Sequence, residues 1–206
     1  MSFLTPLFAA LAALFPLLNP VGNTPIFFSI TANDTPQYRR RQALKTAINV
    51  LIILSVCLVA GRYILEMFGL SVPILRLAGG LVVANVGWGL LQQSPKLDDA
   101  ANDEARDKID VSLSPMALPI IANPGAMSVA IALGANPGKV QNELACLTAL
   151  VLLTVLNYVC LLLGEPMVKK LGRNGMDAFN KVLGFLVLGI GVNLVTSGAL
   201  ALFKGT

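Results

Sequence analysis

Long uncharged stretches alternate with short charged segments along the chain. Six long windows hold no Asp, Glu, Lys or Arg: residues 2–33, 46–61, 77–95, 111–138, 144–164 and 182–203. A helix needs about 20 apolar residues to cross the hydrocarbon core of a bilayer. The pattern therefore predicts an all-α integral membrane protein with six transmembrane helices. The second window is short, and we expect Lys45 and Arg62 to extend it by lying at the two interfaces with their charged ends in water.

Composition agrees with a membrane protein, and the distribution of charge predicts its orientation in the membrane. Of the 206 residues, 55% are hydrophobic and 13% are charged, against roughly 25% charged in a soluble domain. The net charge of +4 is explained by basic residues in the loops between the spans, so no nucleic-acid partner is expected. Most basic residues follow spans one, three and five: Arg39, Arg40, Arg41, Lys45, Lys96, Arg106, Lys108, Lys169, Lys170, Arg173 and Lys181. The positive-inside rule then predicts cytoplasmic loops here and both termini on the non-cytoplasmic side.

The longest loop mixes acidic and basic residues. We expect a cytoplasmic acidic linker at residues 92–111, between a first three-helix unit at 1–91 and a second at 112–206. A regulatory or partner-binding segment is the alternative for this loop.

The two halves of the chain resemble each other. A shift of 102 to 105 positions aligns Asn19-Pro20 with Asn123-Pro124, Thr24 with Ser128, Thr46 with Thr148, Gly61 with Gly164, Phe68-Gly69 with Leu171-Gly172, and Arg76-Leu77-Ala78-Gly79 with Lys181-Val182-Leu183-Gly184. A unit of three spans begins and ends on opposite faces, so the second copy must insert upside down. The sequence predicts a 3+3 inverted repeat, a plan that recurs in secondary transporters.

Helix-breaking residues interrupt the first and fourth spans near their centres, in "LLNPVGNTP" at residues 17–25 and "IIANPGAMS" at 120–128. Proline lacks an amide proton and pushes the preceding residue out of the α region, which places the breaks at Asn19 and Asn123. Unpaired backbone groups facing lipid would each cost several kcal/mol. We therefore expect discontinuous or re-entrant helices whose breaks face protein or a cavity.

Such breaks suit a small zwitterionic solute. A half-helix that starts after the proline exposes amide protons for a carboxylate, and one that ends before it exposes carbonyls for an ammonium group or a cation. Amide and hydroxyl side chains add donors and acceptors without a buried charge. The candidate substrate-binding residues are Asn19, Pro20, Gly22, Thr24, Asn123, Pro124, Gly125 and Ser128, with Asn85 and Asn193 as secondary candidates. The alternative is that prolines and asparagines serve helix packing alone.

We expect the remaining spans to pack around the two broken helices and support them. Spans three and six are rich in small residues, such as Gly80 and Ala84, which permit close helix approach. The chain has no His, and its carboxylates lie near span ends, so we expect no enzyme, no metal site and no cofactor. Cys57 and Cys160 occupy matching positions, which leaves a transmembrane thiol carrier as an alternative, although their apolar neighbours favour buried thiols.

Several blocks resemble the MarC family of integral membrane proteins: "PLLNPVGNTPIF" at 16–27, "FGLSVPILRLAGGLVV" at 68–83, "SPMALPIIANPGAMS" at 114–128 and "KVLGFLVLGIGVNLVTSG" at 181–198. The resemblance implies a six-span protein of the prokaryotic inner membrane. Some relatives are similar to transporters of small neutral amino acids such as glycine and alanine. One departure concerns Asn123, which stands where the family usually has glycine, so the resemblance leaves room for a different substrate.

Together these features predict a secondary transporter, importer or exporter, of a small neutral or zwitterionic solute, working by alternating access around two broken helices. The expected partners are that solute and the lipid bilayer. Coupling to Na⁺ or H⁺ and assembly as a homo-oligomer stay open. A non-transporting structural or regulatory membrane protein is a further alternative.

Overall fold

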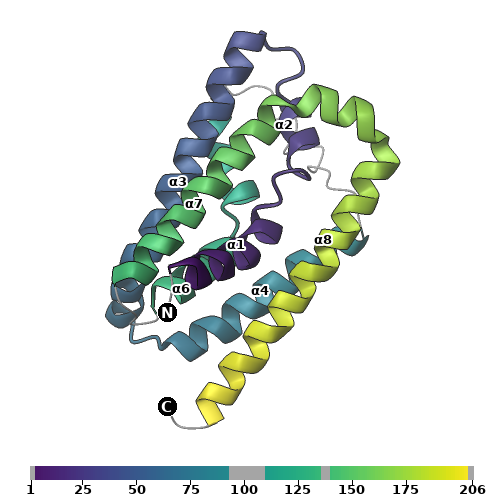
Figure 1. Cartoon of the computed structure of the whole chain (residues 1–206). Helices are drawn as coiled ribbons and strands as arrows, with labels where there is room; N and C mark the ends of the chain where they lie inside the picture. The colour runs from purple at the N-terminus through teal and green to yellow at the C-terminus, as the bar shows by residue number, and fades with distance from the viewer. Residues whose placement is uncertain (1–2, 93–109, 136–139, 204–206) are drawn as a thin grey trace.

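Every regular element in the described part of the chain is a helix (Figure 1). The computed structural model describes residues 3–92, 110–135 and 140–203, so most of the expected acidic linker lies outside the described residues. The helices are α1 (Leu4–Leu18), α2 (Thr24–Ile30), α3 (Pro36–Met67), α4 (Val72–Gln92), η1 (Ser112–Ile121), α6 (Pro124–Gly134), α7 (Val140–Leu162) and α8 (Gly164–Phe203).

The described residues hold four or five candidate membrane spans, against the six expected. Among the described residues, four stretches are long and apolar enough to cross a membrane: Pro36–Gly61, Val72–Gln92, Asn142–Leu162 and Asn174–Phe203. The pair η1 and α6, bent by 70°, makes a fifth if it is taken as one broken span. The first window is divided into α1 with 15 residues and α2 with 7, each shorter than a bilayer requires. A sixth span is therefore not confirmed.

The short broken helices occupy the middle of the molecule (Figure 1). The long helices α3 and α7 lie along one side of them, and α4 and α8 along the other. The core between these layers is apolar, with Leu14, Leu18, Phe27, Leu54, Met116, Ile121 and Leu150 fully buried. The outer faces expose large apolar side chains, such as Ile52, Val56, Val155 and Phe185. Such a surface fits hydrocarbon rather than water.

Helices α4 and α8 touch through their backbones at regularly spaced glycines. A Cβ atom added to Gly80 would lie 2.8 Å from the carbonyl oxygen of Gly191, and one added to Gly87 would lie 2.9 Å from that of Gly184. Since the α8 partner falls in number as the α4 residue rises, the two helices are antiparallel. A Cβ at Gly191 would overlap the backbone of Ala84, so the close approach expected from Gly80 and Ala84 is confirmed.

Two glycines with positive φ lie next to α4 and within α8. Gly69, between α3 and α4, has φ of +65°, and Gly172, which interrupts α8, has φ of +63°. No atom would lie within 4 Å of a Cβ at either position. Backbone conformation, rather than lack of room, therefore favours glycine at both sites.

Candidate functional site at the meeting of the two breaks

The first break begins at Asn19, which ends α1 in the left-handed region at φ of 41° and ψ of 59°. Asparagine adopts this conformation more readily than most residues, because its short polar side chain bonds locally. The Asn19 Oδ1 atom accepts a hydrogen bond from the Gly22 amide at 3.0 Å. The next helix, α2, begins only at Thr24, with Pro25 in its first turn. A half-helix thus starts after Pro20, with three residues in between, and Pro25 lies in its first turn, where a missing amide proton costs no helical hydrogen bond.

Side chains pair two carbonyl groups at the first break, one at the end of α1 and one just after it. The Asn23 Nδ2 atom donates to the carbonyl of Leu18 at 2.7 Å, and the Thr24 hydroxyl donates to that of Pro20 at 2.9 Å. All of these residues are buried. Because buried backbone acceptors require partners, these bonds make the interruption tolerable inside an apolar core. Asn23 was not singled out from the sequence, although it lies in the same polar stretch as Thr24.

The second break begins at Asn123, which caps the start of α6. Its backbone is extended, with φ of −69° and ψ of 162°, and its Oδ1 atom accepts from the Ala126 amide at 2.9 Å. Pro124 stands at the first helical position, as expected. The Asn123 Nδ2 atom donates to the carbonyl of Leu17 at the end of α1, also at 2.9 Å. One buried side chain thus joins the two breaks directly.

A third asparagine, Asn180 of α8, completes the group. Its Oδ1 atom accepts from Asn19 Nδ2 at 3.3 Å. Because the Gly22 amide holds Asn19 Oδ1, Asn19 must present its amide nitrogen to Asn180, and this fixes the orientation of the Asn180 amide. Asn180 is only 1% exposed, and its Nδ2 atom has no hydrogen-bond partner among the described residues. An unsatisfied buried donor of this kind costs about 1–3 kcal/mol.

Glycine is required beside these amides. A Cβ atom added to Gly22 would overlap the side-chain amides of Asn19 and Asn180. At the second break, a Cβ on Gly125 would lie 2.9 Å from Cγ2 of Val83 on α4. Both glycines therefore let other groups approach the main chain closely, as the sequence suggested.

The other sequence candidates are placed differently. Ser128 is half-buried against Gly79 of α4, and Pro124 is exposed. Asn85 and Asn193 are exposed on α4 and α8, so the structure does not bring them together with the buried asparagines. A residue that the sequence did not single out is Asn157 of α7, which is 1% exposed and has neither side-chain polar atom paired within the described residues.

The amides of the two predicted asparagines are engaged with protein groups in this conformation. Asn19 bonds Gly22 and Asn180, and Asn123 bonds Ala126 and Leu17. Their role here is to hold the breaks, while Asn180 beside them has a donor without a partner among the described residues. Cys57 and Cys160 are free thiols, each 8% exposed, on α3 and α7. Such buried thiols lack the accessibility of reactive cysteines.

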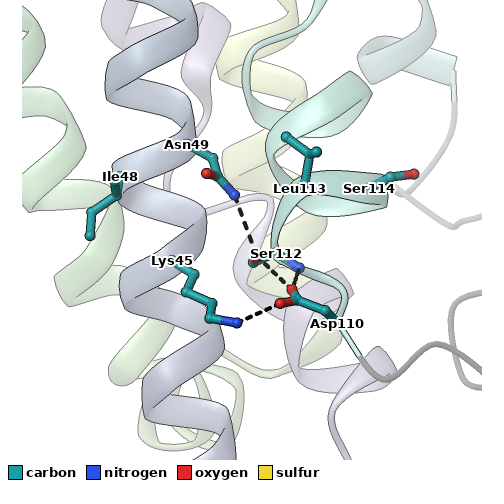
Figure 2. Close-up of a pocket in the computed structure, with 7 residues that line it drawn as sticks. All are labelled: Lys45, Ile48, Asn49, Asp110, Ser112, Leu113 and Ser114. Atoms are coloured by element: carbon teal, nitrogen blue, oxygen red, sulfur yellow. Dashed lines mark hydrogen bonds and ion pairs between the residues drawn. The ribbon is translucent and has the colours of Figure 1, made fainter.

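A separate open pocket of about 600 Å³ lies where η1 begins (Figure 2). It is lined by Lys45, Ile48 and Asn49 of α3 and by Asp110, Ser112, Leu113 and Ser114. Lys45 Nζ lies 2.5 Å from Asp110 Oδ2, and the Ser112 hydroxyl donates to Asp110 Oδ1 at 2.6 Å. The hydrogen bond from Lys45, followed by that from Ser112, lowers the pKa of the Asp110 carboxyl to about 2.

The fold and these sites define a multi-pass, all-helical membrane protein built around two interrupted helices that hydrogen-bond to each other. The description "MarC family integral membrane protein" matches residues 4–203, and the chain belongs to the MarC family. The family resemblance of the sequence blocks is thus confirmed.

Similar proteins come from bacteria and archaea. The chain is 31% identical to a "UPF0056 membrane protein" of Buchnera aphidicola subsp. Baizongia pistaciae, over 90% of this chain and 88% of that one. It is 30% identical to the "UPF0056 membrane protein YhcE" of Escherichia coli (strain K12), over 93% and 91%. Identity is 28% to the "UPF0056 inner membrane protein MarC" of Escherichia coli (strain SMS-3-5 / SECEC), over 94% of both chains. A further relative, 27% identical, is from Methanocaldococcus jannaschii. No solved structure matches this chain.

Proposed function

We propose that the protein is a secondary transporter, not an enzyme, for a small neutral or zwitterionic solute such as glycine or alanine. The solute binds where the two breaks meet and crosses by alternating access around them. The observation that carries this proposal is the buried meeting of the breaks at Asn123 and Leu17, with the unpaired Asn180 donor at the same interruption.

The polar groups at this place match both ends of a small amino acid. The Asn180 Nδ2 atom can donate to a carboxylate oxygen. The carbonyls of Leu17, Leu18 and Pro20 each accept one side-chain bond and keep a second lone pair for an ammonium group. These groups carry no net charge, so binding a zwitterion requires no ionised side chain in the core. The missing Cβ of Gly22 lets the amides of Asn19 and Asn180 lie against the main chain at the proposed binding place.

Reciprocal contacts support an inverted repeat as the architecture for this transport. A Cβ at Gly61 would lie 2.6 Å from Ile131, and a Cβ at Gly164 would lie 3.9 Å from Phe28. One shift of 103 positions converts Gly61 to Gly164 and Phe28 to Ile131. A two-fold axis between the units, 1–91 and 112–206, would produce such a pair of contacts. The matched positive φ of Gly69 and Gly172 has the same explanation.

Antiparallel packing supports the inversion itself. Within the described residues, α4 runs antiparallel to α8, its counterpart at the matching place of the second unit. Figure 1 shows α3 and α7, the other matched pair, running side by side in opposite directions. Copies related by an axis in the membrane plane have this property, and copies related by an axis along the membrane normal do not.

The proposed location is the inner membrane of a prokaryotic cell, with both termini outside the cytoplasm. The basic residues of the loops after the first, third and fifth predicted spans support this orientation. A relative is named as an inner membrane protein.

Uptake and counterflow of labelled glycine and alanine into liposomes test the proposal. We expect the protein to exchange one of these amino acids across the liposome membrane. Asn180→Leu should slow this exchange by about tenfold or more, because it removes a hydrogen-bond donor whose loss would weaken solute binding by about 1.4 kcal/mol. Asn174→Leu is the matched control, because Asn174 is exposed on the same helix. Flux equal to that of empty liposomes for all small neutral amino acids would contradict the substrate class. Equal loss in both variants would contradict the site.

A further inference from the structure

The pocket at the start of η1 presents charges of both signs beside apolar side chains (Figure 2). Lys45 and Asp110 are paired but stay open to the surroundings, with side chains 56% and 45% exposed. An ammonium group has three donors, and the bond to Asp110 uses one of them. Within the described residues, Asp110 Oδ1 accepts two bonds from Ser112, and Oδ2 accepts one, from Lys45. Both charged groups therefore retain capacity for a ligand.

The rest of the pocket wall mixes the polar side chains of Asn49, Ser112 and Ser114 with two exposed apolar ones. Ile48 is 46% exposed and Leu113 is 53% exposed. Lys45 is the last charged residue before the uncharged stretch 46–61 of α3. A lysine that bounds an apolar stretch marks the level of the membrane interface. The charged pair is thus at the depth of lipid headgroups, with apolar surface beside it.

Ile48 also lines a second depression, the groove between α3 and α7. This groove is bounded by Leu44, Ala47, Ile48, Leu51, Val151, Thr154, Val155 and Tyr158, and its volume is about 150 Å³. The hydroxyl of Thr154 donates to the carbonyls of Leu150 and Val151 on its own helix. The groove therefore presents a mostly apolar surface, which adjoins the charged pair through one shared side chain.

We propose that this pocket binds a zwitterionic phospholipid with a primary ammonium group, whose headgroup lies on Lys45 and Asp110 and whose acyl chain crosses Ile48 into the α3–α7 groove. Phosphate oxygens accept the remaining donors of Lys45, and the lipid ammonium donates to Asp110. A choline headgroup has no N–H to donate, and a glycerol headgroup has no cation. The site therefore selects phosphatidylethanolamine over phosphatidylcholine and phosphatidylglycerol. A free amino acid offers the same charges but leaves the apolar groove empty.

Native mass spectrometry of the purified full chain, incubated with the three lipids carrying identical acyl chains, tests this site. We expect phosphatidylethanolamine to be retained several-fold more than the other two. Lys45→Gln and Asp110→Asn should each remove the preference. Lys170→Gln is the matched control, because Lys170 is exposed on α8 and does not line the pocket.

A second variant separates lipid binding from loss of the ion pair. Leu113→Trp fills the pocket from an exposed position while leaving Lys45 and Asp110 in place, and it should also abolish retention. Equal retention of the three lipids, or a preference that survives both Lys45→Gln and Leu113→Trp, overturns the proposal. A stability gain from millimolar glycine that requires Lys45, without lipid selectivity, would identify a site for free zwitterions and overturn the lipid assignment. None of these outcomes depends on transport.

Discussion

The side-chain amide of Asn123 donates to the main-chain carbonyl of Leu17 at 2.9 Å, although the two residues are 106 positions apart in sequence. The same side chain accepts the Ala126 amide at the start of α6. A single residue therefore caps one broken helix and pairs the end of the other.

Asn123→Asp tests the link between the breaks. Aspartate caps helices as well as asparagine does, but it cannot donate to the Leu17 carbonyl. We expect the variant to lose about 1–3 kcal/mol of stability, because a buried acceptor loses its donor and meets a carboxylate instead. Thermal unfolding in detergent measures the loss. Asn174→Asp, at an exposed position, should change little. Equal unfolding temperatures for Asn123→Asp and the unmodified protein would show that the link contributes nothing.

Gly22→Ala tests the close packing of amides at the first break. The added methyl group would overlap the side chains of Asn19 and Asn180, so these amides must shift. We expect a loss of about 1–3 kcal/mol from overpacking, together with reduced amino acid flux. The control is Gly89→Ala, because no atom lies within 4 Å of a Cβ at Gly89. If both variants behaved alike in unfolding and flux assays, the crowding at Gly22 would be irrelevant.

Two glycines of α8 predict effects of opposite sign. A Cβ at Gly191 would overlap the backbone of Ala84, whereas nothing lies within 4 Å of one at Gly189. Gly191→Ala should therefore destabilise the protein by about 1–3 kcal/mol through overpacking. Gly189→Ala should stabilise it by about 0.5–1 kcal/mol, because alanine favours a helix over glycine. Unfolding of the two variants side by side checks the signs. Stabilisation by both would contradict the backbone contact between α4 and α8.

The pH dependence of stability should reveal the Asp110 interaction. Lys45 and Ser112 lower the pKa of Asp110 from its ordinary value of 3.8 to about 2. A carboxyl whose folded pKa is lowered contributes stability above the unfolded value and loses it as pH falls through the folded value. We expect the stability difference between the unmodified protein and Asp110→Asn to shrink between about pH 4 and pH 2. The pair is half exposed, so the effect should be small and weakened by salt. A difference that stays constant over this range would exclude the ion pair as its cause.

The positions of the breaks could be predicted from the sequence, but their partners could not. Proline and the residue before it determine local geometry, and both interruptions occur at Asn19 and Asn123. The distant partners, Asn180 for Asn19 and Leu17 for Asn123, follow from tertiary packing, which the local sequence does not reveal. Asn180 itself lies between Phe179 and Lys181, so the sequence presents it as the border of a charged segment rather than as a core residue.

Asn85 and Asn193 are exposed because of the helix face on which each of them lies. Asn85 lies two residues before Gly87, and Asn193 lies two residues after Gly191. Two residues turn a helix by about 200°, so both asparagines are on the face opposite the glycine contact. The regular spacing of Gly80 and Gly87, and of Gly184, Gly191 and Gly198, was a signal from which this face could have been found.

The glycine contact between α4 and α8 also constrains how the molecule can change shape. With main chain resting on main chain, neither helix can slide past the other without a steric clash or a void. Any rearrangement must carry both as one rigid body. Gly69 lies just before α4, and Gly172 interrupts α8 before the part that packs on α4. Both have positive φ and open space around the Cβ position, so both are suited to act as hinges.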